Sequence, residues 1–299
     1  MSTVEATPLA GNEVETLEAG LDSLTTGGSK KNSSDSKRTR KVMAAIMPAF
    51  FAISFLLIVW TGLAYFKIKP SSLLPNPLNV WQSMATLSHK GVLWGAVGNS
   101  FRRAAVGFIA SVFVGTILGL CLVRFRLLRT SIGPLVSGLQ SLPSVAWVPA
   151  AIIWFGVSND AIYAVVLSGA VPSIAVGLLA GVRQVPPLYL RVGRLIGARG
   201  FNTMRFITFP AALPGYFAGV KQGWAFSWRA LMAAELIASS PGLGNSLGQL
   251  LQTGRRLSDM NLVLAVIILI LIVGIGIELI VFGPIERAIL RTRGLLADS

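Results

Sequence analysis

Six segments of this chain are apolar over roughly the 20 residues that a helix needs to cross a lipid bilayer. We expect spans at about residues 44–66, 102–123, 133–156, 160–182, 211–238 and 262–283. Inside hydrocarbon the backbone cannot bond to water, so each span must satisfy its own hydrogen bonds as a helix. The pattern therefore predicts an all-α polytopic membrane protein with about six transmembrane helices.

The composition supports a membrane protein and argues against a nucleic-acid partner. The 299 residues are 53% hydrophobic and only 13% charged, with a formal net charge of +14. Such a charge is typical of nucleic-acid binding, but here the basic residues flank apolar spans instead of covering a soluble helix face. The single cysteine, Cys121, excludes a disulfide or a cysteine-based metal site within one chain. We expect no cofactor and no metal.

The distribution of Lys and Arg predicts the orientation of the spans. If the N-terminus is cytoplasmic, seventeen basic residues fall on the cytoplasmic side and five on the other side. Cytoplasmic loops of membrane proteins carry such an excess. We therefore expect a multi-pass protein of the cell (plasma or inner) membrane, in contact with lipid, with both termini and the 183–210 loop in the cytoplasm.

The first 41 residues differ from the rest of the chain. They contain no Phe, Trp or Tyr and are rich in Ser, Thr, Gly and charge. Such a segment cannot bury enough apolar area to offset the entropy of ordering it. We expect residues 1–41 to form a disordered cytoplasmic tail, its basic end against anionic headgroups, and residues 42–295 to form the membrane domain.

The chain lacks the groups that covalent chemistry would need. There is no G-x4-G-K-[ST] phosphate loop, and the only histidine, His89, lies in an outer loop. No span combines acidic, His or Ser/Lys groups in a catalytic arrangement. The chain is therefore not expected to be an enzyme, and energy for transport must come from an ion gradient or an ATP-hydrolysing partner.

The loop at 183–210 has a pattern that predicts helix, glycine turn, helix. Pro186 and Pro187 end the preceding helix, and residues 188–196 are expected to form a short helix. Gly197 and Gly200 allow a sharp turn. Phe201 then offers an apolar knob, and Pro210 and Pro214 suit the restart of a helix. Two interpretations stay open: insertion into a groove of another protein, or an ordinary connector that is basic only because it faces the cytoplasm.

The same loop resembles the E-A-A-x3-G-x9-I-x-L-P signature of the membrane subunits of binding-protein-dependent ABC importers. The matching positions are Gly197, Ile207 and Pro210. The positions of E-A-A hold Arg191, Val192 and Gly193, of which Gly193 keeps the small size, and Phe209 replaces Leu. The resemblance assigns ATPase coupling to Arg191, Val192, Gly193, Gly197, Ala198, Gly200, Phe201, Ile207 and Pro210.

The resemblance extends over about residues 45–295. Stretches at 100–108, 141–149, 154–156, 210–214, 228–235 and 242–244 are similar to the sulfonate, nitrate and taurine branch of these permeases, and most similar to its aliphatic-sulfonate members. The resemblance implies a MetI-like type I permease fold and ATP-driven import of a small anionic solute, an aliphatic sulfonate or taurine. The implied partners are an ABC ATP-binding subunit, an extracytoplasmic substrate-binding protein and a second copy of the chain.

Ionisable residues in the fifth span are candidates for the translocation pathway, because such groups within membranes are usually functional. Lys221, Trp228 and Glu235 are spaced at i, i+7 and i+14, close to one helix face, and Arg229 lies beside them. These four residues either line the pathway, where Lys221 and Arg229 favour an anion, or include a buried pair of Glu235 with a basic residue that holds helices together.

The third span contains residues that break helix regularity. Pro143, Trp147 and Pro149 suit a gate or a packing kink equally well. Small residues four apart, such as Gly177 and Gly181, either mark close helix contacts or arise by chance in a glycine-rich chain.

Three alternatives to this reading remain open. The same machinery could carry nitrate, bicarbonate or a thiamine-precursor pyrimidine. The chain could be an ion-coupled secondary transporter, although no repeat of broken helices supports this. A membrane enzyme is disfavoured by the missing catalytic groups.

Overall fold

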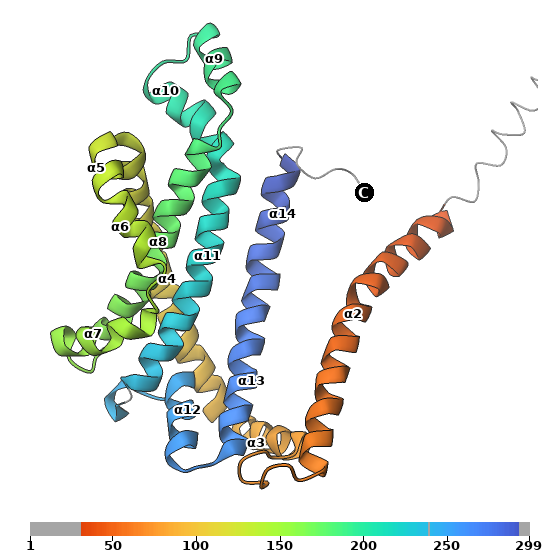
Figure 1. Cartoon of the computed structure of the whole chain (residues 1–299). Coiled ribbons are helices and arrows are strands. Elements are labelled where there is room, and N and C mark those ends of the chain that lie inside the picture. Colours follow the sequence, from red (N-terminus) through yellow and green to blue (C-terminus); the bar gives the residue numbers. More distant parts are fainter. Residues whose placement is uncertain (1–30, 239, 293–299) are drawn as a thin grey trace, which may run out of the picture. The chain divides into compact units, whose positions relative to one another are not determined.

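The computed structural model describes residues 31–238 and 240–292, and every regular element in these ranges is a helix (Figure 1). The chain divides into two compact units, residues 1–68 and 69–299. The first unit contains α2 (Lys31–Tyr65), which includes Pro48. Residues 1–30 of the predicted tail lie outside the described residues, whereas residues 31–41 belong to α2.

The second unit is built from long helices joined by short ones. In chain order these are α3 (Pro77–His89), α4 (Val92–Arg124), α5 (Arg126–Ser131), α6 (Gly133–Leu139), the 3-10 helix η2 (Ser144–Trp147), α7 (Val148–Phe155), α8 (Asn159–Arg183), α9 (Pro187–Leu195), α10 (Phe201–Thr203), the π-helix η3 (Met204–Thr208), α11 (Phe209–Ile237), the 3-10 helix η4 (Pro241–Leu243), α12 (Leu247–Arg256), α13 (Met260–Ile277), the π-helix η5 (Glu278–Phe282) and α14 (Gly283–Thr292).

Helix α8 packs between α4 and α11 and forms the centre of this unit. It begins at Asn159, where the hydroxyl of the capping Ser158 accepts a hydrogen bond from the Ala161 N–H. The side chains of Val165, Val166 and Leu231 are buried in the core between the helices. Because these long apolar helices share one core, they hold the two ends of α11 in fixed places.

Glycines set the close approach of α8 to its neighbours. A Cβ on Gly177 would overlap the backbone of Gly219, and a Cβ on Gly181 would lie 2.6 Å from the carbonyl oxygen of Ala212. Toward α4, a Cβ on Gly115 would lie 2.8 Å from Cβ of Ile174. These small residues therefore mark helix contacts, which settles the alternative that the sequence left open.

Three described helices have the length and apolar composition to cross a membrane: Val92–Arg124, Asn159–Arg183 and Met260–Thr292. A fourth crossing is possible if the pair Gly133–Leu139 and Ser144–Phe155, bent by 100°, forms one span. The expected span at 133–156 is thus broken, because Pro143 lacks an N–H and disfavours helix in the residue before it. That α2 and α11 also cross stays a prediction.

The helices of the second unit have two distinct ends (Figure 1). The turn-rich segment with α9 and α10 lies at one end, which we call the α9 end. Helices α3 and α12 lie at the opposite end, the α12 end. Helix α11 runs from one end to the other.

Candidate functional site

The loop at the α9 end forms the predicted helix, turn and helix. Helix α9 starts at Pro187 and ends in a Schellman turn: the Ala198 N–H donates to the Gly193 carbonyl (2.9 Å) and the Gly197 N–H donates to the Arg194 carbonyl (3.2 Å). Gly197 has φ +85°, a left-handed conformation that favours glycine. The predicted short helix and sharp turn are confirmed.

The second helical arm of this loop, α10 followed by η3, begins after another glycine, Gly200. Gly200 has φ +57° and ψ −122°, which is strained for any residue with a Cβ. After it, α10, η3 and α11 follow without a gap. The π-turn of η3 ends where the Phe209 N–H donates to the Met204 carbonyl, just before Pro210, which cannot donate in an α-helical ladder.

A close contact joins the two arms of the loop. The Ile207 side chain reaches into the space that a Cβ on Gly193 would need, and Gly193 is buried. The nearest atom is the flexible Cδ1 end of Ile207, which would have to move to admit a Cβ. Position 193 therefore packs directly against Ile207, the isoleucine of the sequence pattern, and favours a small residue.

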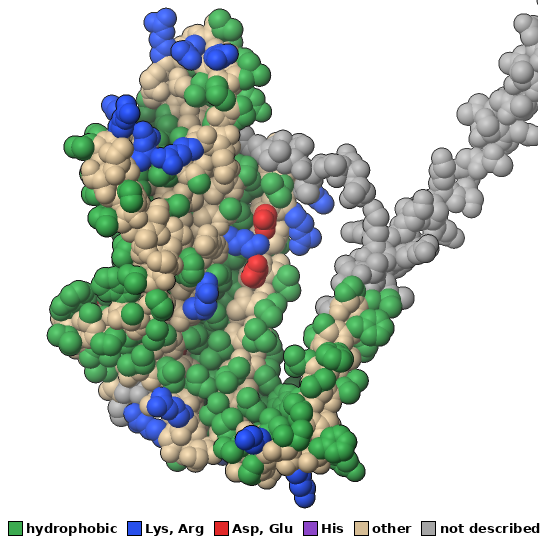
Figure 2. Space-filling view, viewed as in Figure 1, with side chains coloured by type: hydrophobic (Ala, Val, Ile, Leu, Met, Phe, Trp, Pro, Cys, Tyr) green, Lys and Arg blue, Asp and Glu red, His purple; other side chains and the backbone are tan. Residues whose placement is uncertain are grey.

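The outer surface of the loop is apolar at its tip and basic around it. Leu195, Ile196 and Phe201 are 87%, 77% and 74% exposed. The exposed arginines around them are Arg191, Arg194, Arg199 and Arg205, and residues 183–210 contain no Asp or Glu. Figure 2 shows Lys and Arg side chains gathered toward this end. Contiguous apolar exposure with a polar rim is typical of a binding surface.

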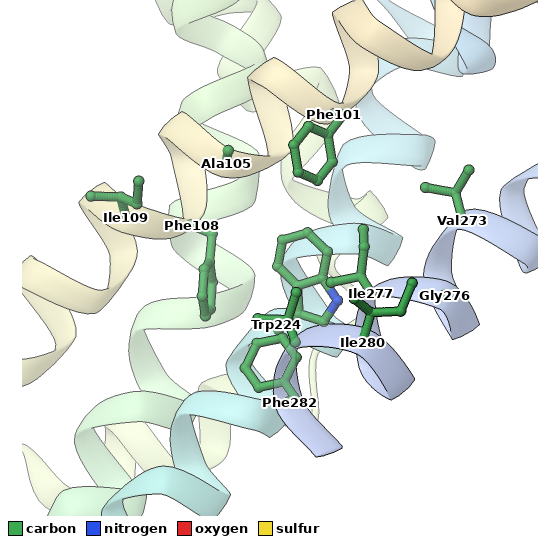
Figure 3. Close-up of a pocket in the computed structure, with 11 residues that line it drawn as sticks. Phe101, Ala105, Phe108, Ile109, Trp224, Val273, Gly276, Ile277, Ile280 and Phe282 are labelled. Carbon is green, nitrogen blue, oxygen red and sulfur yellow. The ribbon is translucent and has the colours of Figure 1, made fainter. Parts of the chain in front are cut away.

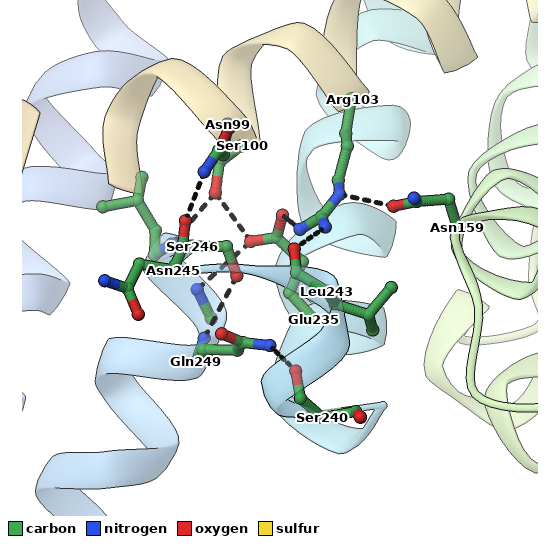
Figure 4. A network of polar contacts seen from close by, with 12 residues as sticks. Asn99, Ser100, Arg103, Asn159, Glu235, Ser240, Leu243, Asn245, Ser246 and Gln249 are labelled. Atoms are coloured by element: carbon green, nitrogen blue, oxygen red, sulfur yellow. Dashed lines mark hydrogen bonds and ion pairs between the residues drawn. The ribbon is translucent and has the colours of Figure 1, made fainter. Parts of the chain in front are cut away.

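A buried polar network lies near the α12 end (Figure 4). Glu235 is 1% exposed and forms an ion pair with Arg103, at 3.0 Å between Oε1 and Nη1. Its other oxygen accepts hydrogen bonds from the Ser100 hydroxyl (2.7 Å) and the Gly248 N–H (3.2 Å). Ser100 in turn accepts one from the Leu247 N–H.

Arg103 extends this network to two further segments. Its Nε donates to Oδ1 of Asn159 at 2.9 Å, and its Nη2 donates to the Leu243 carbonyl. The pair thus connects α4, α8, α11, η4 and α12. This arrangement matches the interpretation of Glu235 as part of a buried pair that holds helices together. The sequence gave no signal that Arg103 is the basic residue that pairs with Glu235.

The other two residues of the predicted stripe also pack inside the second unit. Lys221 forms ion pairs with Glu278 (3.2 Å) and Glu286 (3.0 Å). Trp228 is 8% exposed and stacks on Trp224. The three residues do share one face of α11, as predicted, but that face contacts α12, α13, η5 and α14.

Arg229 faces a different part of the molecule. It lines a groove of about 330 Å³ at the break between α6 and η2, together with Gln140, Ser141, Pro143 and Ser144. Of the predicted gate residues, Pro143 lines this groove, Trp147 is half-buried against the core, and Pro149 is exposed.

A second hollow is lined by apolar and aromatic side chains (Figure 3). It measures about 420 Å³ and lies between α4, α11, α13 and η5. Phe108, Trp224 and Phe282 meet edge-to-face or at a tilt along its wall. It offers no charged group to an anionic solute.

Comparison with known proteins identifies relatives of this arrangement. Residues 111–283, more than half of the chain, match the family described as binding-protein-dependent transport system inner membrane component. The taurine transport system permease protein TauC of Escherichia coli (strain K12) is 28% identical over 235 residues, which cover 76% of this chain and 83% of TauC. The protein SsuC of Bacillus subtilis (strain 168), which carries the name of an aliphatic sulfonates transport permease, is 26% identical over 216 residues, covering 72% of this chain and 77% of SsuC.

The fold has a counterpart among solved structures. A chain of the MetNI methionine ABC transporter in an inward-facing conformation superposes with a TM-score of 0.56 at 19% identity, covering 66% of this chain and 96% of that chain. At this identity the likeness concerns the fold alone. The expected MetI-like fold is confirmed.

Proposed function

Because the chain belongs to the family of binding-protein-dependent transport system inner membrane components, we propose that it is the membrane subunit of an ATP-driven importer and that its 187–210 loop binds the ATP-hydrolysing subunit. The chain itself performs no hydrolysis. It converts the movement of its partner into opening and closing of a path for solute.

The exposed tip of the loop is the observation that carries this proposal. Leu195, Ile196 and Phe201 present apolar side chains on a frame built from two left-handed glycines. Apolar and aromatic anchors with arginines around them are common in protein interfaces. The complementary surface on the partner is an apolar cleft with an acidic rim.

Helix α11 supplies the mechanical connection. It follows the loop at Phe209 and ends at Ile237, next to the Arg103–Glu235 pair. The helix is continuous from Phe209 to Ile237, at a rise of about 1.5 Å per residue, and on this proposal displacement of the loop moves the α12 end as well. On this proposal the loop and both termini face the cytoplasm and the α12 end faces the substrate-binding protein.

The proposed cargo is a small anion, an aliphatic sulfonate or taurine. Its support is the resemblance to permeases named for taurine and aliphatic sulfonates. Two copies of the chain would enclose the path, since one copy leaves the Arg229 groove open on one side. Nitrate, bicarbonate and a pyrimidine are the alternative cargoes that the test must separate.

Two experiments test the proposal. Purification of the tagged chain in mild detergent is expected to bring down a second copy of the chain and an ATP-hydrolysing subunit; purification of the chain without any ATPase would contradict the importer. Growth of a deletion strain is expected to fail on taurine or alkanesulfonates as sulfur sources and to continue on sulfate. Normal growth on all of them would refute the sulfonate cargo and leave the ATPase result standing.

A further inference from the structure

Five basic side chains lie within the long helices α4 and α11: Arg102, Arg103, Arg124, Lys221 and Arg229. Arg103, Lys221 and Arg229 differ in their surroundings. Arg103 is neutralised by Glu235, and Lys221 by Glu278 and Glu286. Among the described residues, no carboxylate lies within ion-pair distance of Arg229. An unneutralised charge at membrane depth is costly unless it has a functional partner.

The contacts of Arg229 hold its guanidinium without neutralising it. Its Nε donates to the Ala225 carbonyl at 3.0 Å, and the guanidinium lies 4.7 Å from the centre of the Phe226 ring. A cation over an aromatic face is attracted by the ring. The side chain is therefore anchored at Nε while it remains exposed, and its terminal nitrogens are available to a ligand.

The groove around Arg229 has a mixed lining, in which apolar side chains outnumber the polar ones. The break between α6 and η2 contributes Gln140, Ser141 and Ser144. The Gln140 side-chain oxygen accepts a hydrogen bond from the Ser173 hydroxyl (3.3 Å), which ties the break to α8. Pro143 and Val145 add apolar surface. A fixed cation, hydroxyls and a small apolar wall suit a ligand with an oxyanion group on a short carbon body.

The position of Arg229 along α11 also suits a translocation path that solute enters at the α12 end. Arg229 lies eight residues before Ile237 and twenty after Phe209, so it is about 12 Å from the α12 end of the helix and about 30 Å from the loop. A solute delivered at the α12 end reaches Arg229 early in its passage.

We propose that the groove between Arg229 and the α6–η2 break is an anion-recognition site of the translocation path, which selects solutes that carry a sulfonate, carboxylate or similar oxyanion. This rests on the proposed function. Lys221 is excluded from the site because its charge is already balanced by Glu278 and Glu286. Trp228 and Glu235 position helices and do not touch solute.

The test compares charge variants of Arg229 in the assembled importer. The chain is reconstituted with its ATPase and binding protein in vesicles of phosphatidylcholine, and uptake of labelled taurine, ethanesulfonate and bicarbonate is measured. Arg229→Gln is expected to lower uptake of the transported anion at least about tenfold, because a charged hydrogen bond is lost; Arg229→Lys retains part of it. Arg287→Gln is the matched control, since Arg287 is exposed and its Nε also donates to a carbonyl four residues back; its uptake stays within about twofold of the parent.

The outcomes separate the site from the proposed function. ATPase copurification stays unchanged in Arg229→Gln, because the loop is intact. Uptake by Arg229→Gln at the parent rate would overturn the anion site while the importer stands. A parent complex that hydrolyses ATP but moves none of the anions would overturn the cargo class and the site together, and absence of a bound ATPase would overturn the proposed function itself.

A lipid headgroup offers the same oxyanion chemistry as a solute. The uptake assay is therefore repeated in vesicles that contain phosphatidylglycerol. The loss in Arg229→Gln is expected in both kinds of vesicle. A loss that appears only with the anionic lipid would assign the groove to an anionic lipid headgroup and overturn the solute site.

Discussion

Ile207 occupies the space that a side chain at position 193 would need, and this contact closes the loop at the α9 end. The two residues stand in different arms of the loop, on α9 and η3. Their contact favours a small residue at position 193, whereas the neighbouring acidic and alanine positions of the family pattern are replaced by Arg191 and Val192. The loop therefore keeps its shape of helix, turn and helix, with a surface charge that differs from the family pattern.

Gly193→Ala is expected to cost little, because its methyl group meets only the flexible Cδ1 end of Ile207, whereas the larger Gly193→Val is expected to loosen the loop. Overpacking by the valine costs about 1–3 kcal/mol, which should appear as faster hydrogen–deuterium exchange over residues 187–209 and weaker ATPase binding. The double variant Gly193→Val/Ile207→Ala restores space and is expected to recover slow exchange. Exchange in Gly193→Val equal to that of the parent would show that the contact does not hold the loop together.

The effect of a substitution at Gly197 on ATPase binding should depend on the backbone preference of the new residue and not on its volume. No atom lies within 4 Å of a Cβ built on Gly197, but φ is +85°. Gly197→Asn is expected to keep most ATPase binding, since Asn tolerates the left-handed conformation, whereas Gly197→Val is expected to lose it at a strain cost of about 1–3 kcal/mol. Copurification of the ATPase measures both; equal binding by the two variants would refute the turn as the cause.

The Arg103–Glu235 pair should show strong coupling in a double-mutant cycle. Glu235→Gln leaves Arg103 buried without a counter-charge, at a cost of about 3–5 kcal/mol in the free energy of unfolding. Arg103→Met/Glu235→Gln removes both charges and is expected to be more stable than Glu235→Gln. Thermal unfolding in detergent measures this, with Lys221→Gln as a control because its ion pairs are partly exposed. Purely additive effects would contradict the coupling.

The contact between Gly177 and Gly219 predicts a position-specific effect of adding one methyl group. Gly177→Ala is expected to destabilise the protein by about 1–3 kcal/mol, because the methyl group overlaps the Gly219 backbone. Gly98→Ala is the matched control, since a Cβ on Gly98 meets no atom within 4 Å and alanine favours helix. Melting temperatures of the two variants test this; a loss in Gly98→Ala as large as in Gly177→Ala would contradict it.

Local sequence patterns predicted much of the loop, because turns depend on residues close together in the chain. The helix expected at 188–196 forms over Pro187–Leu195, and the glycine expected at the turn has the left-handed conformation. The helix-breaking residues of the third span likewise produce the 100° bend between α6 and η2–α7. In each case the cause lies within a few residues of the effect.

Long-range partners could not be predicted in this way. Arg103 and Glu235 meet only because α4 and α11 pack together, and nothing in either helix specifies that partner. The spacing of Lys221, Trp228 and Glu235 correctly placed them on one helix face, but periodicity does not show what that face packs against. Arg229, beside the stripe in sequence, instead faces the open groove.

The most direct test of the proposal that the 187–210 loop binds the ATP-hydrolysing subunit is a cross-link from the tip of this loop. In a Cys121→Ser background, which removes the only cysteine, Phe201→Cys carries a photoactivatable maleimide in the assembled complex. Leu257→Cys, 70% exposed just after α12, is the control. The account predicts a cross-link to the ATP-hydrolysing subunit from position 201 and none from position 257. A complex that hydrolyses ATP but gives no cross-link from position 201, or gives one from position 257, would contradict it.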